Sequence, residues 1–476
     1  MVFSSVVFLF VFLPIFLLVY FIVPNKIQLK NLVLFVFSLV FYAWGEQEIV
    51  LIMLASCVID YWSARAIEKG YRKAGLICSL IFNLSFLLVF KYLDFTFEIY
   101  NDFISSIFSD ESLPYLATLP HIALPIGISF YTFQTMSYTI DVYYGKVKAN
   151  KNFIEFSTYV TMFPQLVAGP IVRYADIEKS LSDRKTTRHD FAIGAERFII
   201  GLAKKVLIAN YFAYWADYIF GLPDYALGTS VAWVGIISYS FQIYFDFSGY
   251  SDMAIGLGRM LGFRILENFN YPYISRSIKE FWRRWHISLS SWFRDYLYIP
   301  LGGNRKGRSR TYINLFIVFF ITGLWHGSSW NFIVWGLFHG LFLVIERLGF
   351  DKILERIWKP FQHIYALLIA LIGWVFFRAD DLETALDYLG TMFLFNVDST
   401  VNFGMFMNFE FIFYFLAACI LSTPLYLNLS NRFVSAERNN YTAALSVHRL
   451  MLLGLLVITI IFVSSSSYNP FIYFRF

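Results

Sequence analysis

The chain has 476 residues, of which 58% are hydrophobic and only 15% charged, and its mean hydropathy is +0.58. Soluble domains carry about 25% charged residues, so this composition excludes an ordinary soluble enzyme, and the 21% aromatic content excludes a disordered chain. The formal net charge of +5 does not indicate a function, because in a membrane protein the positions of the charges are informative and their sum is not. No basic stripe suited to nucleic acid occurs outside the membrane-flanking loops.

Apolar runs long enough to cross a bilayer follow one another along the whole chain. A spanning helix needs about 20 mostly apolar residues. The runs are residues 2–23, 31–45, 49–66, 74–92, 122–144, 191–220, 230–262, 311–346, 360–378, 406–428 and 449–463. The first follows no Lys or Arg and precedes no small-residue cleavage site, which favours a retained span over a signal peptide. The run 311–346 is long enough for a helical hairpin, so we expect an all-α polytopic membrane protein with about 10–12 spans.

The loop charges predict an orientation. Lys and Arg collect in cytoplasmic loops. They gather at 26–30, 69–73, 145–151, 173–190 and 276–310, whereas 94–121 is acidic and has none. This alternation predicts an outside N-terminus. If 311–346 is a hairpin, the C-terminus is outside too.

The run 241–252 (FQIYFDFSGYSD) places Asp246, Ser248 and Asp252 inside an apolar span. Ionisable groups are costly in a bilayer and usually line a cavity or pathway. These residues therefore indicate either a polar tunnel wall or an interhelical hydrogen-bond network.

Residues 281–292 (FWRRWHISLSSW) combine three tryptophans with arginines and His286. Trp282, Trp285 and Trp292 can share one helix face, as in an interfacial helix, or the helix can form the cytoplasmic rim of a catalytic tunnel. The following loop is glycine-rich and basic, with Arg305, Lys306, Arg308 and Arg310. It either holds phosphates or is a positive-inside topology signal, and it lacks the spacing of a P-loop.

His326 lies in the middle of an apolar run, between Trp325 and a glycine. A buried imidazole with a near-neutral pKa suits general-base catalysis, although a lone histidine in a membrane is more often structural. His339 is read as packing.

The last 13 residues are four serines, Ser464 to Ser467, followed by an aromatic stretch that ends the chain at Phe476. Such a tail is expected to lie in a groove and not in solvent. Tyr473 supplies a phenolic oxygen, a nucleophile when a base is near. The alternative is an aromatic anchor at the membrane interface.

Several classes of site are not supported. The cysteines, Cys57, Cys78 and Cys419, lie far apart and predict neither a disulfide framework nor a metal site. HExxH, GxSxG and paired carboxylates are missing from the predicted accessible loops, which argues against a metalloprotease, a serine hydrolase and a glycosidase. The sequence shows no internal repeat with broken helices in matching halves, so it does not support a secondary transporter.

Seven segments resemble the membrane-bound O-acyltransferase family, in particular the bacterial branch that contains the alginate O-acetyltransferase membrane subunit. They are 137–143 (SYTIDVY), 164–170 (PQLVAGP), 201–205 (GLAKK), 241–252, 281–286 (FWRRWH), 296–303 (YLYIPLGG) and 323–327 (GLWHG). The resemblance covers nearly the whole chain. It implies one membrane domain at 1–463, with a catalytic core at about 137–346 and a tail at 464–476. The fold would be a ring of helices around a thinned centre crossed by a tunnel.

The same resemblance implies the chemistry. The family's near-invariant histidine falls on His326 and its second, upstream polar position on His286. Asp246, Ser248, Asp252 and Trp325 would line the tunnel. A cytoplasmic acyl donor, acetyl-CoA, would meet the histidine from one side and the acceptor from the other. The tail is similar to the aromatic motif of a small teichoic-acid D-alanylation peptide, which makes Tyr473 a candidate acyl relay.

We therefore expect O-acetylation of an exported cell-envelope polysaccharide such as alginate, at the bacterial inner membrane. An extracytoplasmic partner of the SGNH-hydrolase type would assist. The basic residues 302–310 would attract the phosphates of coenzyme A. D-alanyl transfer from a carrier protein is an alternative, and export of a polymer or lipid without chemistry is another. The sequence does not name the polymer.

Overall fold

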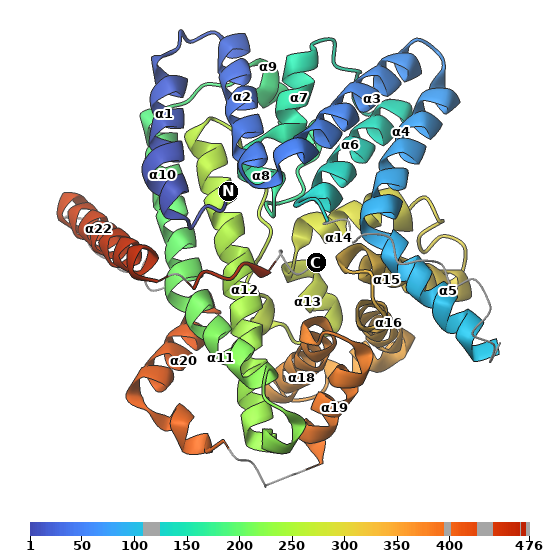
Figure 1. The fold of residues 1–476 in the computed structure, drawn as a ribbon, viewed down its shortest axis with the longest axis vertical. Coiled ribbons are helices and arrows are strands. Elements are labelled where there is room, and N and C mark those ends of the chain that lie inside the picture. The colour runs from blue at the N-terminus through green and yellow to red at the C-terminus, as the bar shows by residue number, and fades with distance from the viewer. Residues whose placement is uncertain (108–123, 395–400, 426–440, 467, 473–476) are drawn as a thin grey trace. The chain divides into compact units, whose positions relative to one another are not determined.

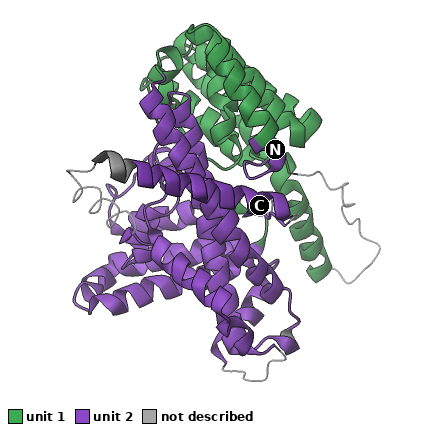
Figure 2. Ribbon diagram, turned by 90° about the vertical axis from the view of Figure 1, so that its left-hand side faces the viewer, with its two compact units in different colours: residues 1, 10–185, 325–329 green, residues 2–9, 186–324, 330–476 purple. Residues whose placement is uncertain are grey.

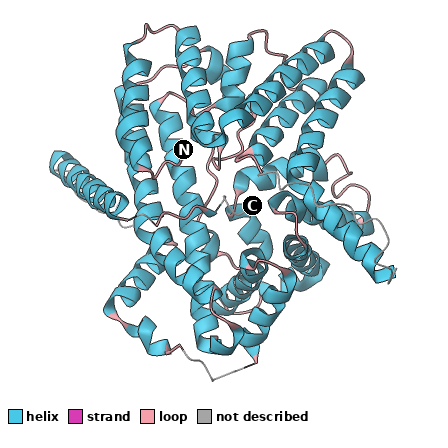
Figure 3. Cartoon of the chain, viewed as in Figure 1, coloured by secondary structure: helices cyan, strands magenta, loops and turns pink. Residues whose placement is uncertain are grey.

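The computed structural model describes residues 1–107, 124–394, 401–425, 441–466 and 468–472. Every regular element in these ranges is a helix, which confirms the predicted all-α class (Figure 3). The chain divides into two compact units (Figure 2). Unit 1 comprises Met1, Phe10–Lys185 and Trp325–Ser329, and unit 2 comprises Val2–Leu9, Thr186–Leu324 and Trp330–Phe476.

Unit 1 is built from the N-terminal helices. They are α1 (Leu13–Ile22), α2 (Ile27–Glu46), α3 (Val50–Glu68), α4 (Arg72–Leu87), α5 (Leu93–Ile107), α6 (Ile128–Tyr143), α7 (Phe153–Thr161), α8 (Phe163–Leu166) and α9 (Tyr174–Ser182). The π-helical turns η1 (Phe8–Phe12) and η3 (Leu88–Tyr92) extend α1 and join α4 to α5.

One boundary in unit 1 was predicted wrongly. The span was expected to end at 92 and an acidic loop to begin at 94, but the helix continues as α5 to Ile107. Apolar residues recur at helical spacing in this segment, and Asp94 and Glu98 occupy the positions between them, so the acidic charges fit on an amphipathic helix. The rest of the acidic segment, 108–121, lies outside the described residues.

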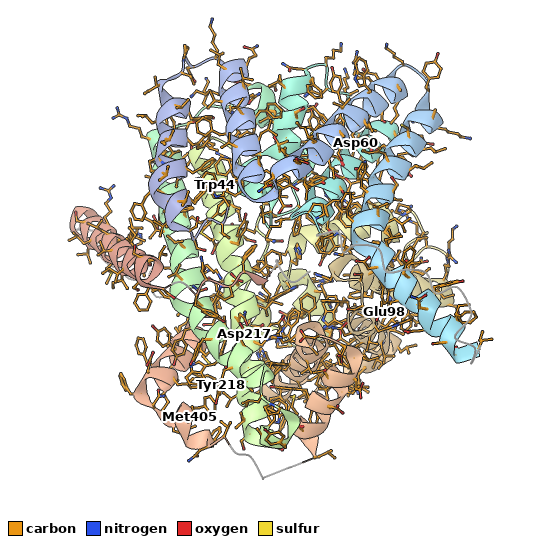
Figure 4. All side chains as sticks on the ribbon, viewed as in Figure 1. Trp44, Asp60, Glu98, Asp217, Tyr218 and Met405 are labelled. Carbon is orange, nitrogen blue, oxygen red and sulfur yellow. The ribbon has the colours of Figure 1, made fainter. Side chains whose placement is uncertain are left out.

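Aromatic packing and one polar cluster hold unit 1 together. The ring of Phe163 packs edge-on against Phe12 and Phe16, with centroid distances of 5.4 and 5.0 Å. Asp60 on α3 is fully buried and accepts hydrogen bonds from Ser79 and Asn83 of α4 (Figure 4). Because a buried carboxylate needs partners, this cluster fixes the register of α3 against α4.

Unit 2 contains the remaining helices, which Figure 1 labels, except for the last two residues of α15, which belong to unit 1. They are α10 (Arg188–Ala203), α11 (Asn210–Phe220), α12 (Thr229–Met260), α13 (Ile278–Arg284), α14 (Ile287–Phe293), α15 (Arg308–His326), α16 (Trp330–Ile345), α17 (Asp351–Leu354), α18 (Lys359–Arg378), α19 (Leu382–Phe393), α20 (Phe409–Leu421) and α22 (Tyr441–Ser465). A π-helical turn, η4 (Lys204–Ala209), joins α10 to α11. The run 311–346 is divided into two helices, as predicted.

The contact between α10 and α12 relies on two glycine pairs. A Cβ on Gly194 would lie 2.5 Å from the carbonyl oxygen of Gly256, and a Cβ on Gly201 would lie 2.6 Å from that of Gly249. In each helix the two glycines are seven residues apart, and therefore on one face. Small residues let membrane helices approach closely, so this face brings the backbones of α10 and α12 into direct contact.

Long apolar helices and exposed apolar side chains identify a polytopic membrane protein. Among the described residues, five stretches are long and apolar enough to cross a bilayer: Ile27–Glu68, Arg72–Ile107, Trp330–Leu354, Lys359–Arg378 and Ser446–Ser465. Large apolar side chains such as Ile22, Leu51, Ile81 and Leu450 are exposed. Exposure of so much apolar surface to water is unfavourable, whereas contact with lipid is not. The ring and the tunnel stay predictions.

Candidate functional site

The predicted tunnel residues of α12 are buried in unit 2 and held by ion pairs. Asp252 accepts hydrogen bonds from Arg197 at 2.7 and 3.0 Å and from Lys204 at 2.7 Å. Asp246 lies 3.0 Å from the Nζ of Lys205, and Ser248 is buried between them. The two carboxylates are therefore paired with cations from α10 and η4, as buried charges require.

The C-terminal tail is bound at Asp246. The backbone N–H of Ile472 donates to Oδ2 of Asp246 at 2.9 Å. Lys205, which pairs with the same carboxylate, donates to the carbonyl oxygen of Pro470. One buried ion pair thus holds two points of the tail backbone.

Side chains fix the rest of the tail. Asn469 exchanges hydrogen bonds with Ser4 near the N-terminus, and Tyr468 donates to Asp217 of α11 at 2.7 Å (Figure 4). The ring of Phe471 packs against Tyr250 of α12 at 5.1 Å. Phe471 and Ile472 are 4% and 3% exposed. The tail is therefore buried at Phe471 and Ile472 while Tyr468 is exposed, and Tyr473 lies outside the described residues. That the tail lies in a groove stays a prediction.

His286 occupies a break between two short helices. The sequence suggested one helix across 281–292, but α13 ends at Arg284 and α14 begins at Ile287. His286 has φ 44°, in the left-handed region that few residues other than glycine adopt. The tryptophans expected at an interface, Trp282, Trp285 and Trp292, are buried. The break turns the imidazole into the core of unit 2.

Asn268 holds this break and orients the imidazole. Its carbonyl oxygen accepts the N–H of Ile287 at 2.9 Å, and its side-chain oxygen accepts the N–H and hydroxyl of Ser288. The same oxygen lies 3.1 Å from Nδ1 of His286. Its amide donates to Ser251 of α12. With Nδ1 as the donor, a neutral imidazole carries its lone pair on Nε2, so this contact selects the nitrogen that can accept a proton.

His326 lies at the end of α15 and belongs to unit 1. It is 5% exposed. Its neighbour Trp325 packs against Phe130 and Phe133 of α6, each at a ring distance of 5.4 Å. Lys91 of η3 donates to the carbonyl oxygens of Trp325 at 2.5 Å and His326 at 3.1 Å. The last turn of the helix is thus held by aromatic packing and by a buried cation.

The basic loop lies at the surface of unit 2. Arg305 and Lys306 of this loop are exposed, and so are Arg308 and Arg310, which lie in the first turn of α15. Gly302, Gly303 and Gly307 have positive φ, and Asn314 of α15 donates to the carbonyl oxygen of Gly303 at 3.0 Å. The glycines let the loop turn sharply, which leaves its guanidinium and ammonium groups free to meet an anion.

A charged cleft of about 920 Å³ lies elsewhere in unit 2, beside α13. Its basic lining side chains, Arg276, Lys279, Arg283, Arg356 and Lys359, are nearly balanced by Glu280, Glu346, Asp351 and Glu355. Burial acts to raise the pKa of Glu280, but the N–H of Arg276 and the guanidinium of Arg284 hold it below its ordinary value. Because acidic groups share this cleft, it attracts phosphate less than the exposed loop does.

Three polar residues that contact predicted site residues, each within one unit, were not themselves predicted. Lys91 contacts the backbone at His326, Asn268 contacts His286, and Lys205 contacts the tail. A lysine within an apolar run is a signal that could have identified Lys91. Asn268 lies in a loop with no local pattern, so only the folded chain reveals it.

Comparison with known proteins places the chain in a family. The model of the membrane-bound O-acyltransferase family matches residues 49–378. The chain is 41% identical to a probable alginate O-acetylase AlgI of Azotobacter vinelandii over the full length of both proteins. It is 46% identical to one of Pseudomonas aeruginosa, covering 83% of this chain and 75% of that protein. It is also 38% identical to a peptidoglycan O-acetyltransferase of Helicobacter pylori, covering 82% and 80%.

Proposed function

Because this chain belongs to the membrane-bound O-acyltransferase family and is an acyltransferase, we propose that it moves an acetyl group from cytoplasmic acetyl-CoA to an exported cell-envelope polysaccharide. The membrane concerned is the bacterial inner membrane. An alginate-like polymer is the favoured acceptor, since relatives at 41–46% identity are named as probable alginate O-acetylases.

The observation that carries the proposal is the burial of His326 at the end of an apolar helix. A thioester that met its acceptor in open water would also be hydrolysed, so acyl transfer needs a site that excludes water. The His326 imidazole is buried beside the Trp325 ring, with 4.9 Å between ring centroids, and provides a proton acceptor in such a site.

In the proposed reaction His326 acts as general base. The oxygen of the attacking hydroxyl forms a bond to the thioester carbonyl carbon while its proton passes to the imidazole. The carbon–sulfur bond then breaks, and the thiolate of coenzyme A takes the proton back from the imidazolium. The atoms balance without a further reactant, and the imidazole returns to its neutral form.

His286 takes a second proton-handling role in this proposal. Its contact with Asn268 leaves the lone pair on Nε2. A neutral ring in this tautomer accepts a proton there, which favours assistance in proton transfer over donation to the oxyanion. Backbone N–H groups then remain the candidates for stabilising the developing negative charge.

Tyr473 is proposed as an acyl relay. The residue before it, Ile472, is bound to Asp246 in the core of unit 2, so the phenol follows directly after a fixed point of the chain. The phenolic oxygen would take the acetyl group from the thioester, and an acceptor hydroxyl would displace the phenolate in a second step. An extracytoplasmic partner of the SGNH type would complete delivery to the polymer.

The donor is proposed to approach the exposed basic loop. Arg305, Lys306, Arg308 and Arg310 offer four cations to the phosphates of coenzyme A. Asp246, Ser248, Asp252 and Trp325 are proposed to line the route between donor and acceptor.

The test follows isotope-labelled acetate into envelope polymers by mass spectrometry in cells that produce the wild type or the His326→Ala variant. We expect labelled O-acetyl esters with the wild type and none with the variant, at equal amounts of membrane-inserted protein. His189→Ala, which alters an exposed histidine, should behave like the wild type. Full ester content with His326→Ala contradicts the role of His326. Polymers that carry D-alanyl esters in place of labelled acetyl esters contradict the proposed donor.

A further inference from the structure

Lys91 is a buried lysine in an apolar stretch, so its contacts must offset the cost of burying its charge. It is 8% exposed and lies within Arg72–Ile107, a stretch apolar enough to cross a membrane. A cation at this depth is costly unless it is paired or solvated. In unit 1 its Nζ contacts the carbonyl oxygens of Trp325 and His326 and lies 5.9 Å from the centre of the Trp325 ring.

The π-helical turn orients this lysine. Asn83, Leu87, Lys91 and Phe95 are all buried and are spaced four residues apart. In a regular α-helix a stripe with this spacing drifts around the axis by about 40° at each step. The wider turn at Leu88–Tyr92 offsets the drift. Lys91 therefore stays on the buried face.

The ammonium meets the end of α15, where it is most stabilising. The last carbonyl groups of an α-helix have no partner within the helix, and their dipoles give this end a partial negative charge. Lys91 satisfies two of these carbonyls, including that of His326 itself. The helix ends there, and α16 begins at Trp330 after three intervening residues.

We propose that Lys91 is the positioning residue for His326: its ammonium fixes the backbone at the helix end, and so the place from which the imidazole acts. This inference rests on the proposed function. Lys91 takes no part in bond making. Because a shift of about 1 Å in a reacting group can reduce a rate by up to about 100-fold, loss of the ammonium should lower kcat and leave donor binding nearly intact.

The test compares the wild type with Lys91→Met, which retains chain length and loses the charge, and Lys91→Arg, which retains charge and donors. Lys30→Met is the matched control. Lys30 is 9% exposed, also belongs to unit 1 and lies over the rings of Tyr20 and Phe21. Each protein is purified in detergent and accepted only if it is monodisperse with a cooperative thermal transition.

Two readouts are taken. Hydrogen exchange, followed by mass spectrometry, reports on the amides of residues 327–331, and steady-state kinetics give kcat and KM for acetyl-CoA. For Lys91→Met we expect exchange at least about tenfold faster and kcat at least about tenfold lower, with KM within about twofold of the wild type. Lys91→Arg should recover part of both losses, and Lys30→Met should match the wild type.

Folded Lys91→Met with unchanged exchange or unchanged kcat overturns the inference. So does a raised KM with unchanged exchange, because Lys91 would then contact the donor. If Lys91→Met does not fold, Lys91→Gln replaces it, since the amide retains donors without the charge. If the wild type transfers no acetyl group, or His326→Ala retains transfer, the proposed function fails, and the exchange data still show whether Lys91 holds the helix end.

Discussion

At the scale of single residues, Tyr473 follows in the sequence directly after a stretch of backbone that is held in place. Ile472 and Pro470 are held by the ion pair of Asp246 and Lys205. We expect Tyr473→Phe to lower acetyl transfer at least about tenfold, because it removes the nucleophilic oxygen and keeps the ring. Label transferred from acetyl-CoA to the acceptor is the measurement.

The matched control is Tyr468→Phe. It removes a hydroxyl from the same tail, one that donates to Asp217, and should leave transfer within about twofold of the wild type. If Tyr473→Phe also transfers at the wild-type rate, the tail is an anchor without a chemical role.

The sequence predicted candidate site residues more readily than it predicted the residues that contact them. Asp246 and His286 stand out because polar groups are rare in apolar runs. Their contacts with Lys205 and Asn268 join residues 41 and 18 positions apart. Such pairs depend on how helices cross, which no local pattern records, so they became visible only in the folded chain.

At the scale of helices, the glycine-lined contact of α10 with α12 predicts intolerance to side chains. Gly201→Leu should lower the thermal midpoint of the purified protein and its monodisperse fraction, because its Cβ would meet the backbone of Gly249. Overpacking of this kind costs about 1–3 kcal/mol.

Gly454→Leu on α22 serves as the control, since a Cβ there meets nothing within 4 Å. It should leave the midpoint unchanged. Equal midpoints for the two variants would show that the close approach of α10 and α12 is not needed for stability.

Hydrophobic runs predicted most long helices but not the short ones. Runs such as 230–262 and 360–378 correspond closely to α12 and α18, because apolar length alone defines a span. The separation of α13 from α14 was missed, since it depends on the left-handed backbone of His286 and its contacts with Asn268. Helix α19 was also missed; it is amphipathic and begins at Leu382, directly after Asp381, whose side chain caps it.

At the scale of the whole molecule, loop charges predict which residues face the cytoplasm. In a chain with Cys57, Cys78 and Cys419 replaced by alanine, a membrane-impermeant maleimide should label Asp102→Cys in intact cells. It should label Asn304→Cys only after permeabilisation. Both positions are exposed. Labelling of Asn304→Cys in intact cells would place the basic loop outside and remove it as a donor surface.

The most direct test of acyl transfer uses purified protein in lipid vesicles supplied with acetyl-CoA labelled in its acetyl group, with an oligosaccharide acceptor and the extracytoplasmic partner. With the wild type, label should appear as an ester on the oligosaccharide and coenzyme A should be released in equal amount. With His326→Ala, neither should rise above the level of empty vesicles. Equal ester formation by the two proteins would contradict a catalytic role for this buried imidazole.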